Sequence, residues 1–182
     1  MLNDEAADVL AYWFGQVKPE RRFAKDDQLD AEIGERFSDL HARLSQRVPD
    51  AWLDNPEDLL AAVIVLDQFS RNLYRSDARA YASDAMALNL AHLAIKRGYD
   101  QLLGPEECQF LYMPFMHSEN PDDQDRAVEL MEEIGNAEAA DYARRHKAII
   151  DRFGRFPHRN AVLGRASTPE EIEFLKQPGS SF

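Results

Sequence analysis

Cysteine is almost absent from this chain. Cys108 is the only one among 182 residues, so a disulfide within the chain is excluded. Such low cysteine usage is typical of proteins from reducing compartments. Cys108 falls early in a stretch that predicts a short helix of mixed polarity. We therefore expect it to be a packing residue and not an activated thiolate.

Long hydrophobic runs are also missing. The longest one, Leu59 to Leu66, is far shorter than the segment that a membrane-spanning helix needs. The first residues, Met1 to Glu5, lack the basic and apolar parts of a secretory signal peptide. We therefore expect a cytoplasmic protein that does not bind a membrane.

The patterns of common catalytic and metal sites are not found either. The sequence has no HExxH, GxSxG, P-loop or Rossmann pattern, and no Cys/His spacing that suits zinc. We therefore expect no metal and no cofactor. The five histidines are His41, His92, His117, His146 and His158. Of these, His41 and His92 fall on predicted helices away from charged clusters, and we expect both to be structural.

Positive charge is scarce overall and concentrated in one stretch. The net charge of −12 argues against nucleic acid or an anionic membrane as the partner. Residues 141–165 are the exception, with seven Lys or Arg against two Asp or Glu. Arg152 to Arg165 also contains phenylalanine, proline and glycine, which indicates a structured loop. Its arginines either pair with the acidic remainder or form an anion site, and both interpretations stay open.

One pattern recurs at four expected helix starts: a capping residue or glycine, then proline, then two acidic residues. The cap serves the free N–H groups of the first turn, proline has no N–H to lose there, and the acids favour the positive end of the helix dipole. The last of the four also has the spacing of a capping box. The four stretches are Asn55–Asp58, Gly104–Glu107, Asn120–Asp123 and Thr168–Glu171.

Apolar residues spaced three and four apart predict seven or eight helices in antiparallel pairs, and no segment favours a strand. The expected ranges are 4–16, 26–47, 56 onward, 83–97, 105–112, 121–134, 137–153 and 169–176. Leu59 to Leu66 is apolar on all sides, so its helix should be central. Pro114 should break the fifth helix and leave 115–119 as a loop. We predict one all-α domain over 1–182, with a frayed tail at 177–182.

Three polar clusters follow or interrupt these helices: Asp67–Arg75, His117–Glu119 and Arg155–Asn160. We predict that they converge on one pocket for a small anionic ligand, because arginine binds carboxylate and phosphate groups in two-point contacts. The predicted ligand-binding residues are Asp67, Arg71, Asn72, Arg75, Glu119, Arg155, Arg159 and Asn160. His117 and His158 are the predicted catalytic residues, since histidine moves protons near neutral pH.

The alternative is that the same clusters only lock the fold. If the third helix continues past Ser70, Asp67 and Arg71 share a face as an i,i+4 pair. The arginines of the basic stretch would then be tied to Asp67 and Glu119. In that case the protein would be a helical interaction module that binds a peptide or a protein partner. Whether the chain is an enzyme, and whether it forms a homodimer, stays open.

Four stretches together carry a resemblance to a known family: Val9–Gly15, Leu66–Arg75, Tyr112–Glu119 and Arg152–Asn160. They are similar to the bacterial domain-of-unknown-function family nine-two-four. The resemblance implies a tetratricopeptide-like, right-handed helical array and no assigned reaction. The array rests on this resemblance alone, since no 34-residue repeat is found in the sequence. Ser70 stands where the family commonly has proline, so we expect the third helix to continue further.

Overall fold

The computed structural model describes residues 2–181. Met1 and Phe182, the last residue of the expected tail, lie outside the described residues. All regular structure in the described part is helical, which confirms the all-α prediction. The chain divides into two compact units: unit 1 covers the chain up to Arg75 together with Arg79–Pro114, and unit 2 covers 76–78 and 115 onward. The single domain and the tetratricopeptide-like array stay predictions.

Most expected helices are present, with short turns added between them. The helices are α1 Asp4–Leu10, α2 Pro19–Arg22, α3 Asp27–Gln46, α4 Asp50–Leu53, α5 Pro56–Ile64, α6 Ser70–Leu73, α7 Asp84–Lys96, α8 Pro105–His117, α9 Pro121–Glu133, α10 Ala137–Phe153 and α11 Pro169–Phe174. The segments Ala11–Gln16 and Val65–Phe69 are π-helical, and Ala78–Tyr81, Tyr99–Leu102 and Pro157–Arg159 are 3₁₀ turns.

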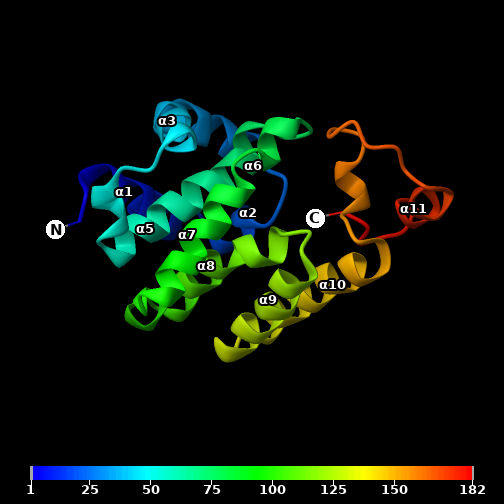
Figure 1. Cartoon of the computed structure of the whole chain (residues 1–182). Helices are drawn as coiled ribbons and strands as arrows, with labels where there is room; N and C mark the ends of the chain where they lie inside the picture. Colours follow the sequence, from blue (N-terminus) through cyan, green and yellow to red (C-terminus); the bar gives the residue numbers. More distant parts are fainter. Residues whose placement is uncertain (1, 182) are drawn as a thin grey trace. The chain divides into compact units, whose positions relative to one another are not determined.

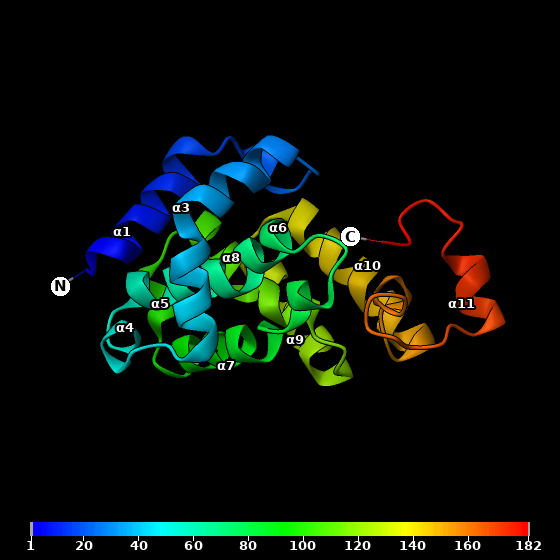
Figure 2. The same ribbon diagram turned by 90° about the horizontal axis from the view of Figure 1, so that it is seen from above.

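Helix α5 is the centre of unit 1, as its apolar run predicts. Every side chain from Asp58 to Ile64 is buried, and the helix packs against α1 and α7 (Figures 1 and 2). Aromatic rings fill the space beside it, with Phe69 lying 5.4 Å from Trp13 and 5.0 Å from Phe37 between ring centroids. Each fully buried large apolar side chain contributes about 1.5–3 kcal/mol, so this core accounts for much of the stability of the unit.

The third expected helix continues past Ser70, as predicted. Helix α5 passes through the π-helical segment Val65–Phe69 into α6 without a break. The Ser70 hydroxyl donates to the carbonyl oxygen of Leu66 at 2.6 Å, one turn earlier in the chain. A serine therefore adds a hydrogen bond at a position where proline would remove one.

The expected break at Pro114 is wrong. Helix α8 runs through Pro114 to His117, so residues 115–117 are helical and not part of a loop. Proline removes one backbone hydrogen bond and costs about 3 kcal/mol in a helix interior. Its neighbours offset this cost, because Leu111, Phe115 and Met116 are all buried. His117 is therefore placed by the last turn of a helix.

Unit 2 is built on the hairpin of α9 and α10, which lie side by side (Figure 1). Gly135, with φ of 78°, makes the short turn between them. Ala139 and Ala143 of α10 and Leu130 and Met131 of α9 are all buried. Beyond α10 the chain forms the loop and short helix α11 that contain the basic stretch.

The predicted helix caps are mostly confirmed. Asn55, Asn120 and Thr168 each accept a backbone hydrogen bond from the first turn of the helix that follows. Ser83 stands at the N-cap position of α7 but does not cap it, because its hydroxyl donates to Ser45 Oγ at 3.3 Å.

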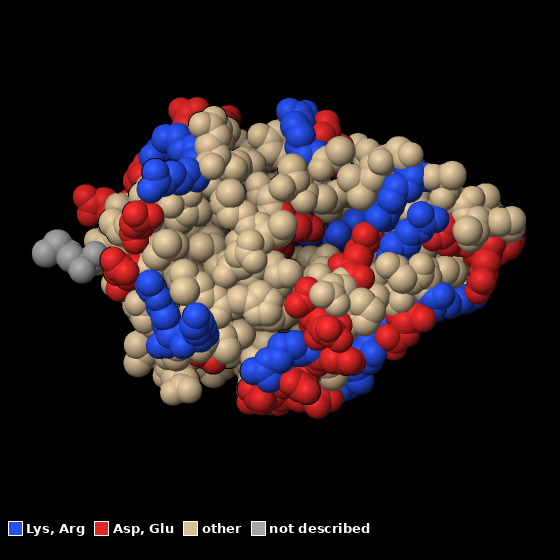
Figure 3. Space-filling view, in the orientation of Figure 1, with Lys and Arg blue, Asp and Glu red and all other residues tan. Residues whose placement is uncertain are grey.

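Charged side chains of both signs alternate over α9 and α10 on the face drawn in Figure 3. Many of them are ion-paired, as in Arg126–Glu129 and Arg144–Glu132. None of the helices in residues 2–181 has the length and hydrophobicity required to span a membrane.

Candidate functional site

The basic stretch Arg152–Arg165 forms an ordered loop in unit 2. Gly154 adopts the left-handed conformation, with φ of 68°, and ends α10. Phe156 is fully buried and Pro157 begins a 3₁₀ turn, so the loop is fixed to the core directly after the helix. The prediction of a structured loop is therefore confirmed.

Glu119 ties this loop to the end of α8. Its carboxylate accepts two hydrogen bonds from Arg165, at 2.7 and 2.9 Å, and one from the backbone N–H of Phe156 at 2.8 Å. Burial raises the pKa of Glu119, but the Arg165 guanidinium and the Phe156 N–H outweigh it and lower the pKa below its usual value. Arg165 also donates to Asn160 Oδ1 at 2.9 Å. Glu119 is therefore an anchor of the loop.

Arg155 is held by the capping box of α11. Its guanidinium donates to both carboxylate oxygens of Glu171, at 2.6 and 2.7 Å. Glu171 also accepts from the backbone N–H of Thr168 at 2.7 Å, and the hydrogen bond from Arg155 is the main reason that its pKa falls to about 2. Asn160, the last residue of the Arg155–Asn160 cluster, donates to Ser167 Oγ at 3.0 Å.

Two histidines, His146 and His158, and one arginine lie against the ring of Phe156, and a third histidine, His117, lies beside His146. The ring centroids of His117 and His146 are 6.1 Å apart, and those of His146 and His158 each lie 5.7 Å from the centroid of Phe156. The Arg159 guanidinium lies over Phe156 at 4.6 Å from the ring centroid and donates to the His117 carbonyl oxygen at 2.9 Å. We call these five residues the histidine cluster.

The histidine cluster disfavours positive charge on its most buried imidazole. Burial and, to a lesser extent, the charges of His117, His158 and Arg159 together lower the pKa of His146 to about 3, against a hydrogen bond to the Tyr142 carbonyl oxygen that raises it. His146 is therefore neutral near pH 7. In chemical terms the cluster combines the imidazole nitrogens of three histidines with the guanidinium of Arg159.

The Asp67–Arg75 cluster lies in unit 1, where its arginines form ion pairs. Arg71 donates to Asp67 Oδ1 at 3.3 Å, which confirms the expected i,i+4 pair. It also makes two hydrogen bonds to the Asp84 carboxylate, at 2.9 and 3.0 Å. Asp67 is fully buried, so these contacts hold a charge that would be costly in the core without a partner.

The two other predicted ligand-binding residues of this cluster share a single carboxylate. Asn72 donates to Asp30 Oδ1 at 2.8 Å, and Arg75 donates to both oxygens of the same group. Asp30 lies on α3, so these contacts fix α6 to α3.

The structure thus brings two of the three predicted clusters together in unit 2. His117 and Glu119 meet residues of the Arg155–Asn160 cluster through Arg159 and Phe156. The Asp67–Arg75 cluster belongs to unit 1, and its place in a common pocket stays a prediction.

Several partners in these contacts do not follow from the sequence. They are Asp30, Asp84, His146 and Glu171. Asp30 and Asp84 are ordinary helical acids, separated from their arginines by 45 and 13 residues. His146 was recognisable only as a member of the buried face of α10. Glu171 was predicted as a cap, and its double role as the partner of Arg155 has no local pattern.

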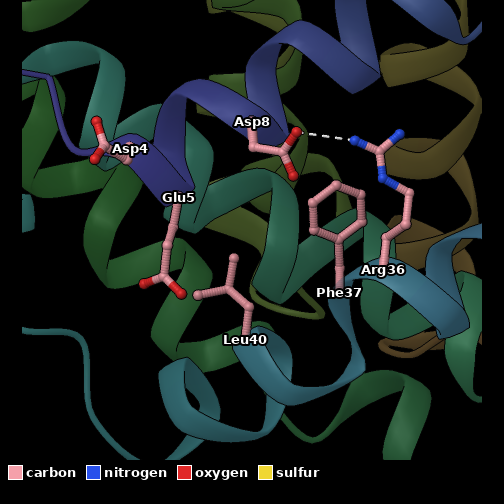
Figure 4. A pocket seen from close by; sticks show the side chains of 6 residues that line it. All are labelled: Asp4, Glu5, Asp8, Arg36, Phe37 and Leu40. Atoms are coloured by element: carbon pink, nitrogen blue, oxygen red, sulfur yellow. Dashed lines mark hydrogen bonds and ion pairs between the residues drawn. The ribbon is translucent and has the colours of Figure 1, made fainter.

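A cavity of about 230 Å³ opens between α1 and α3 in unit 1. Figure 4 shows the side chains that line it: Asp4, Glu5, Asp8, Arg36, Phe37 and Leu40. Asp8 pairs with Arg36 at 2.9 Å, and Glu5 pairs with Arg43. Because these carboxylates have arginine partners, we interpret this cavity as an ion-paired seam between two helices.

The cysteine behaves as the sequence predicts. Cys108 is buried, and burial raises the pKa of its thiol, which is the opposite of what an activated nucleophile needs. Within residues 2–181, no three His, Cys, Asp or Glu side chains form a group that could hold a metal ion.

The fold and these contacts define an all-α protein with a basic loop pinned by ion pairs. The chain belongs to the family described as bacterial protein of unknown function (DUF924), whose model matches residues 9–179. It is also similar to a solved protein of unknown function from Agrobacterium tumefaciens, with 40% identity and a TM-score of 0.90 over 94% of this chain and 97% of the other. No curated protein matches the chain.

Proposed function

We propose that the protein binds a small anionic ligand, a phosphate or a carboxylate, at the histidine cluster of unit 2. The observation that carries the proposal is that His146, His158 and Arg159 lie against the ring of Phe156, with His117 beside His146. Neither the family nor its solved relative is described with an activity. A cytoplasmic location belongs to the same proposal.

Electrostatics supports this ligand class. The charges of His117, His158 and Arg159, together with burial, disfavour protonation of His146. An anion bound among these groups would offset that repulsion and raise the pKa values of the imidazoles. Clusters of this kind mark functional sites more often than random surface does.

The ion pairs divide the predicted ligand-binding residues into two groups within this proposal. Arg159 holds the anion, while Arg155, Glu119 and Asn160 keep the loop in place. In its finer form the proposal is that the protein is an enzyme, in which His117 or His158 transfers a proton to or from the bound ligand. Of the remaining predicted residues, Asp67, Arg71, Asn72 and Arg75 stabilise unit 1 through the carboxylates described above.

Thermal unfolding with and without inorganic phosphate and short carboxylates tests the proposal. A ligand that binds the folded state raises the free energy of unfolding by about 2.7 kcal/mol at a hundred times its Kd. We expect the His158→Gln variant to lose most of the increase. His92→Gln, which changes an exposed histidine of α7, should keep it. Equal increases in both variants would rule out the histidine cluster as the site.

The Arg155→Gln variant tests whether Arg155 holds the loop in place or contacts the anion. We expect it to unfold at a lower temperature, because Glu171 loses its partner, but to keep the shift caused by the anion. If Arg155→Gln leaves the melting temperature unchanged and abolishes the shift, then Arg155 is a ligand contact and the proposed division is wrong.

Exposed apolar side chains in unit 2 favour a second candidate function. Leu163, Ile172 and Leu175 are 38%, 49% and 36% exposed, which is unusual for large apolar residues near a fixed loop. They support the alternative of an interaction module for a peptide or protein partner. Replacing Ile172 and Leu175 by serine should then abolish capture of a partner, whereas the His158→Gln variant should retain it.

A further inference from the structure

Helix α7 carries almost no charge, although it lies at the surface of unit 1. Between Asp84 and Lys96 it contains no Asp, Glu, Lys or Arg, in a chain in which these residues make up 30% of the sequence. Figure 3 accordingly shows an uncharged area over α7 on the face that it draws. A helix of this composition is usually covered on most sides.

Only one side of α7 is covered within unit 1, where the helix packs against α5. The buried residues of this side are Ala87, Leu90, Ala91 and Ala94. On the opposite side Ala85, Asn89 and His92 are exposed. Large apolar side chains flank them on both sides and are themselves partly exposed: Met86, Leu88, Leu93 and Ile95.

The exposed side of α7 has the spacing of a helix–helix contact. Ala85, Leu88, His92 and Ile95 follow one another at intervals of three, four and three residues, which is the pattern of the contact positions in paired helices. Small and apolar side chains at this spacing allow a second helix to pack closely along the first.

The absence of charge on this face favours a second copy of the chain as the partner. Two copies that each carry a net charge of −12 repel one another through most of their surface. The exposed face of α7 is an exception, because two such faces bring no like charges together. A two-fold contact requires a surface that complements itself, and an uncharged row of side chains at helical spacing meets this requirement.

A two-fold axis at right angles to α7 makes the two helices antiparallel. The positive N-terminal end of each helix then lies beside the negative C-terminal end of the other, so the helix dipoles attract. The axis passes near the middle of Asp84–Lys96. Leu88 and Asn89 are the accessible residues closest to that point, so each of them lies near its own counterpart.

The size of the face limits the strength of the contact. A helix of 13 residues is about 20 Å long, and one face of it is smaller than the roughly 800 Å² per partner that stable complexes bury. Leu102, which is 71% exposed in the 3₁₀ turn packed against α7, adds apolar area. We therefore expect a weak dimer, with a Kd of roughly 10–100 µM.

We propose that the exposed face of α7 is a homodimer interface, in which two copies of the chain pack this helix antiparallel about a two-fold axis. The interface lies in unit 1. It does not depend on the anion site proposed in unit 2.

Sedimentation equilibrium between about 1 and 500 µM tests the interface, since this range spans the expected Kd. We expect the average mass to rise from one chain to two. Asn89→Glu places two like charges beside the axis and should weaken the dimer about tenfold or more. Ser38→Glu adds the same charge at an exposed position of α3 and should dimerise like wild type. A wild-type protein that stays monomeric throughout, or an Asn89→Glu variant that dimerises like wild type, would overturn the proposal.

Disulfide cross-linking tests the antiparallel geometry separately. In a Cys108→Ser background, which removes the native thiol, Asn89→Cys should form a cross-linked dimer on mild oxidation because the two positions lie beside the axis. Ser38→Cys is the matched control and should stay largely uncrosslinked. Cross-linking of Ser38→Cys as fast as that of Asn89→Cys would overturn the assignment to α7, and a failure of Asn89→Cys to cross-link would overturn the two-fold arrangement.

Discussion

At the scale of single residues, Glu119 shows how one carboxylate can organise a loop. It joins the end of α8 to Arg165 and to the Phe156 backbone, although 46 residues separate it from Arg165. The carboxylate is half-buried, so its hydrogen bonds to a charged partner are worth more than those of an exposed pair.

We predict that Glu119→Gln lowers the free energy of unfolding by about 1–3 kcal/mol. The amide keeps an oxygen for the Phe156 N–H but loses the charge that holds Arg165. Urea unfolding measures the change. The matched control is Glu133→Gln, which alters an exposed residue 3.9 Å from Arg126 and should stay within about 0.5 kcal/mol of wild type. A Glu119→Gln variant as stable as this control contradicts the anchoring role.

His146 predicts how stability depends on pH. Its pKa is about 3 in the folded protein against 6.5 ordinarily, so below 6.5 the unfolded chain binds a proton that the folded protein does not. Stability should therefore fall as the pH is lowered from 6.5 toward 3. His146→Asn keeps an N–H for the Tyr142 carbonyl and removes the titration, so its stability should depend less on pH.

Urea unfolding at several values between about pH 7 and pH 4 compares the two proteins. Below this range both lose stability further, since the pKa of Glu171 is held at about 2 by Arg155 and the ion pair is lost on protonation. Parallel curves for wild type and His146→Asn would show that His146 does not govern the acid response.

At the scale of elements, the helix starts are the part that the sequence predicts best. The caps of α5, α9 and α11 are local, because the capping side chain and the N–H groups it serves lie within three residues. The predicted helix break at Pro114 is wrong for the opposite reason, because the outcome there depends on contacts that are distant in the sequence. Whether a helix tolerates proline depends on the burial of its neighbours, and that burial is set by distant elements. The π-helical segments likewise follow no pattern that we can identify in the sequence.

We predict that Asn55→Ala destabilises the protein by about 1 kcal/mol. The side chain accepts hydrogen bonds from the N–H groups of Glu57 and Asp58, at 2.9 and 3.1 Å, and alanine leaves both without this partner. The measurement is the urea midpoint, with Asn55→Asp as the control that keeps a capping oxygen. If both variants lose the same stability, the effect does not come from the cap.

At the scale of the whole chain, the composition showed that arginine is concentrated in residues 141–165. It did not show whether these arginines bind a ligand or pair with acidic residues. The excess of arginine in 141–165 correctly indicated an ordered polar loop. The partners of its arginines were only partly predictable. Glu119 was expected as a partner, whereas Glu171 was known only as a cap. Pairs that far apart in the sequence are decided by the fold. The spacing of apolar residues predicted its all-α class, and the resemblance to the family is confirmed.

The anion site is tested most directly by titrating the wild-type protein with inorganic phosphate while following the imidazole resonances of His117, His146 and His158. We expect saturable shifts in His117 and His158, with a Kd of about 1 mM or tighter, and a rise in their pKa values as the bound charge stabilises the imidazolium form. Imidazole resonances and pKa values that phosphate leaves unchanged would contradict the proposed site.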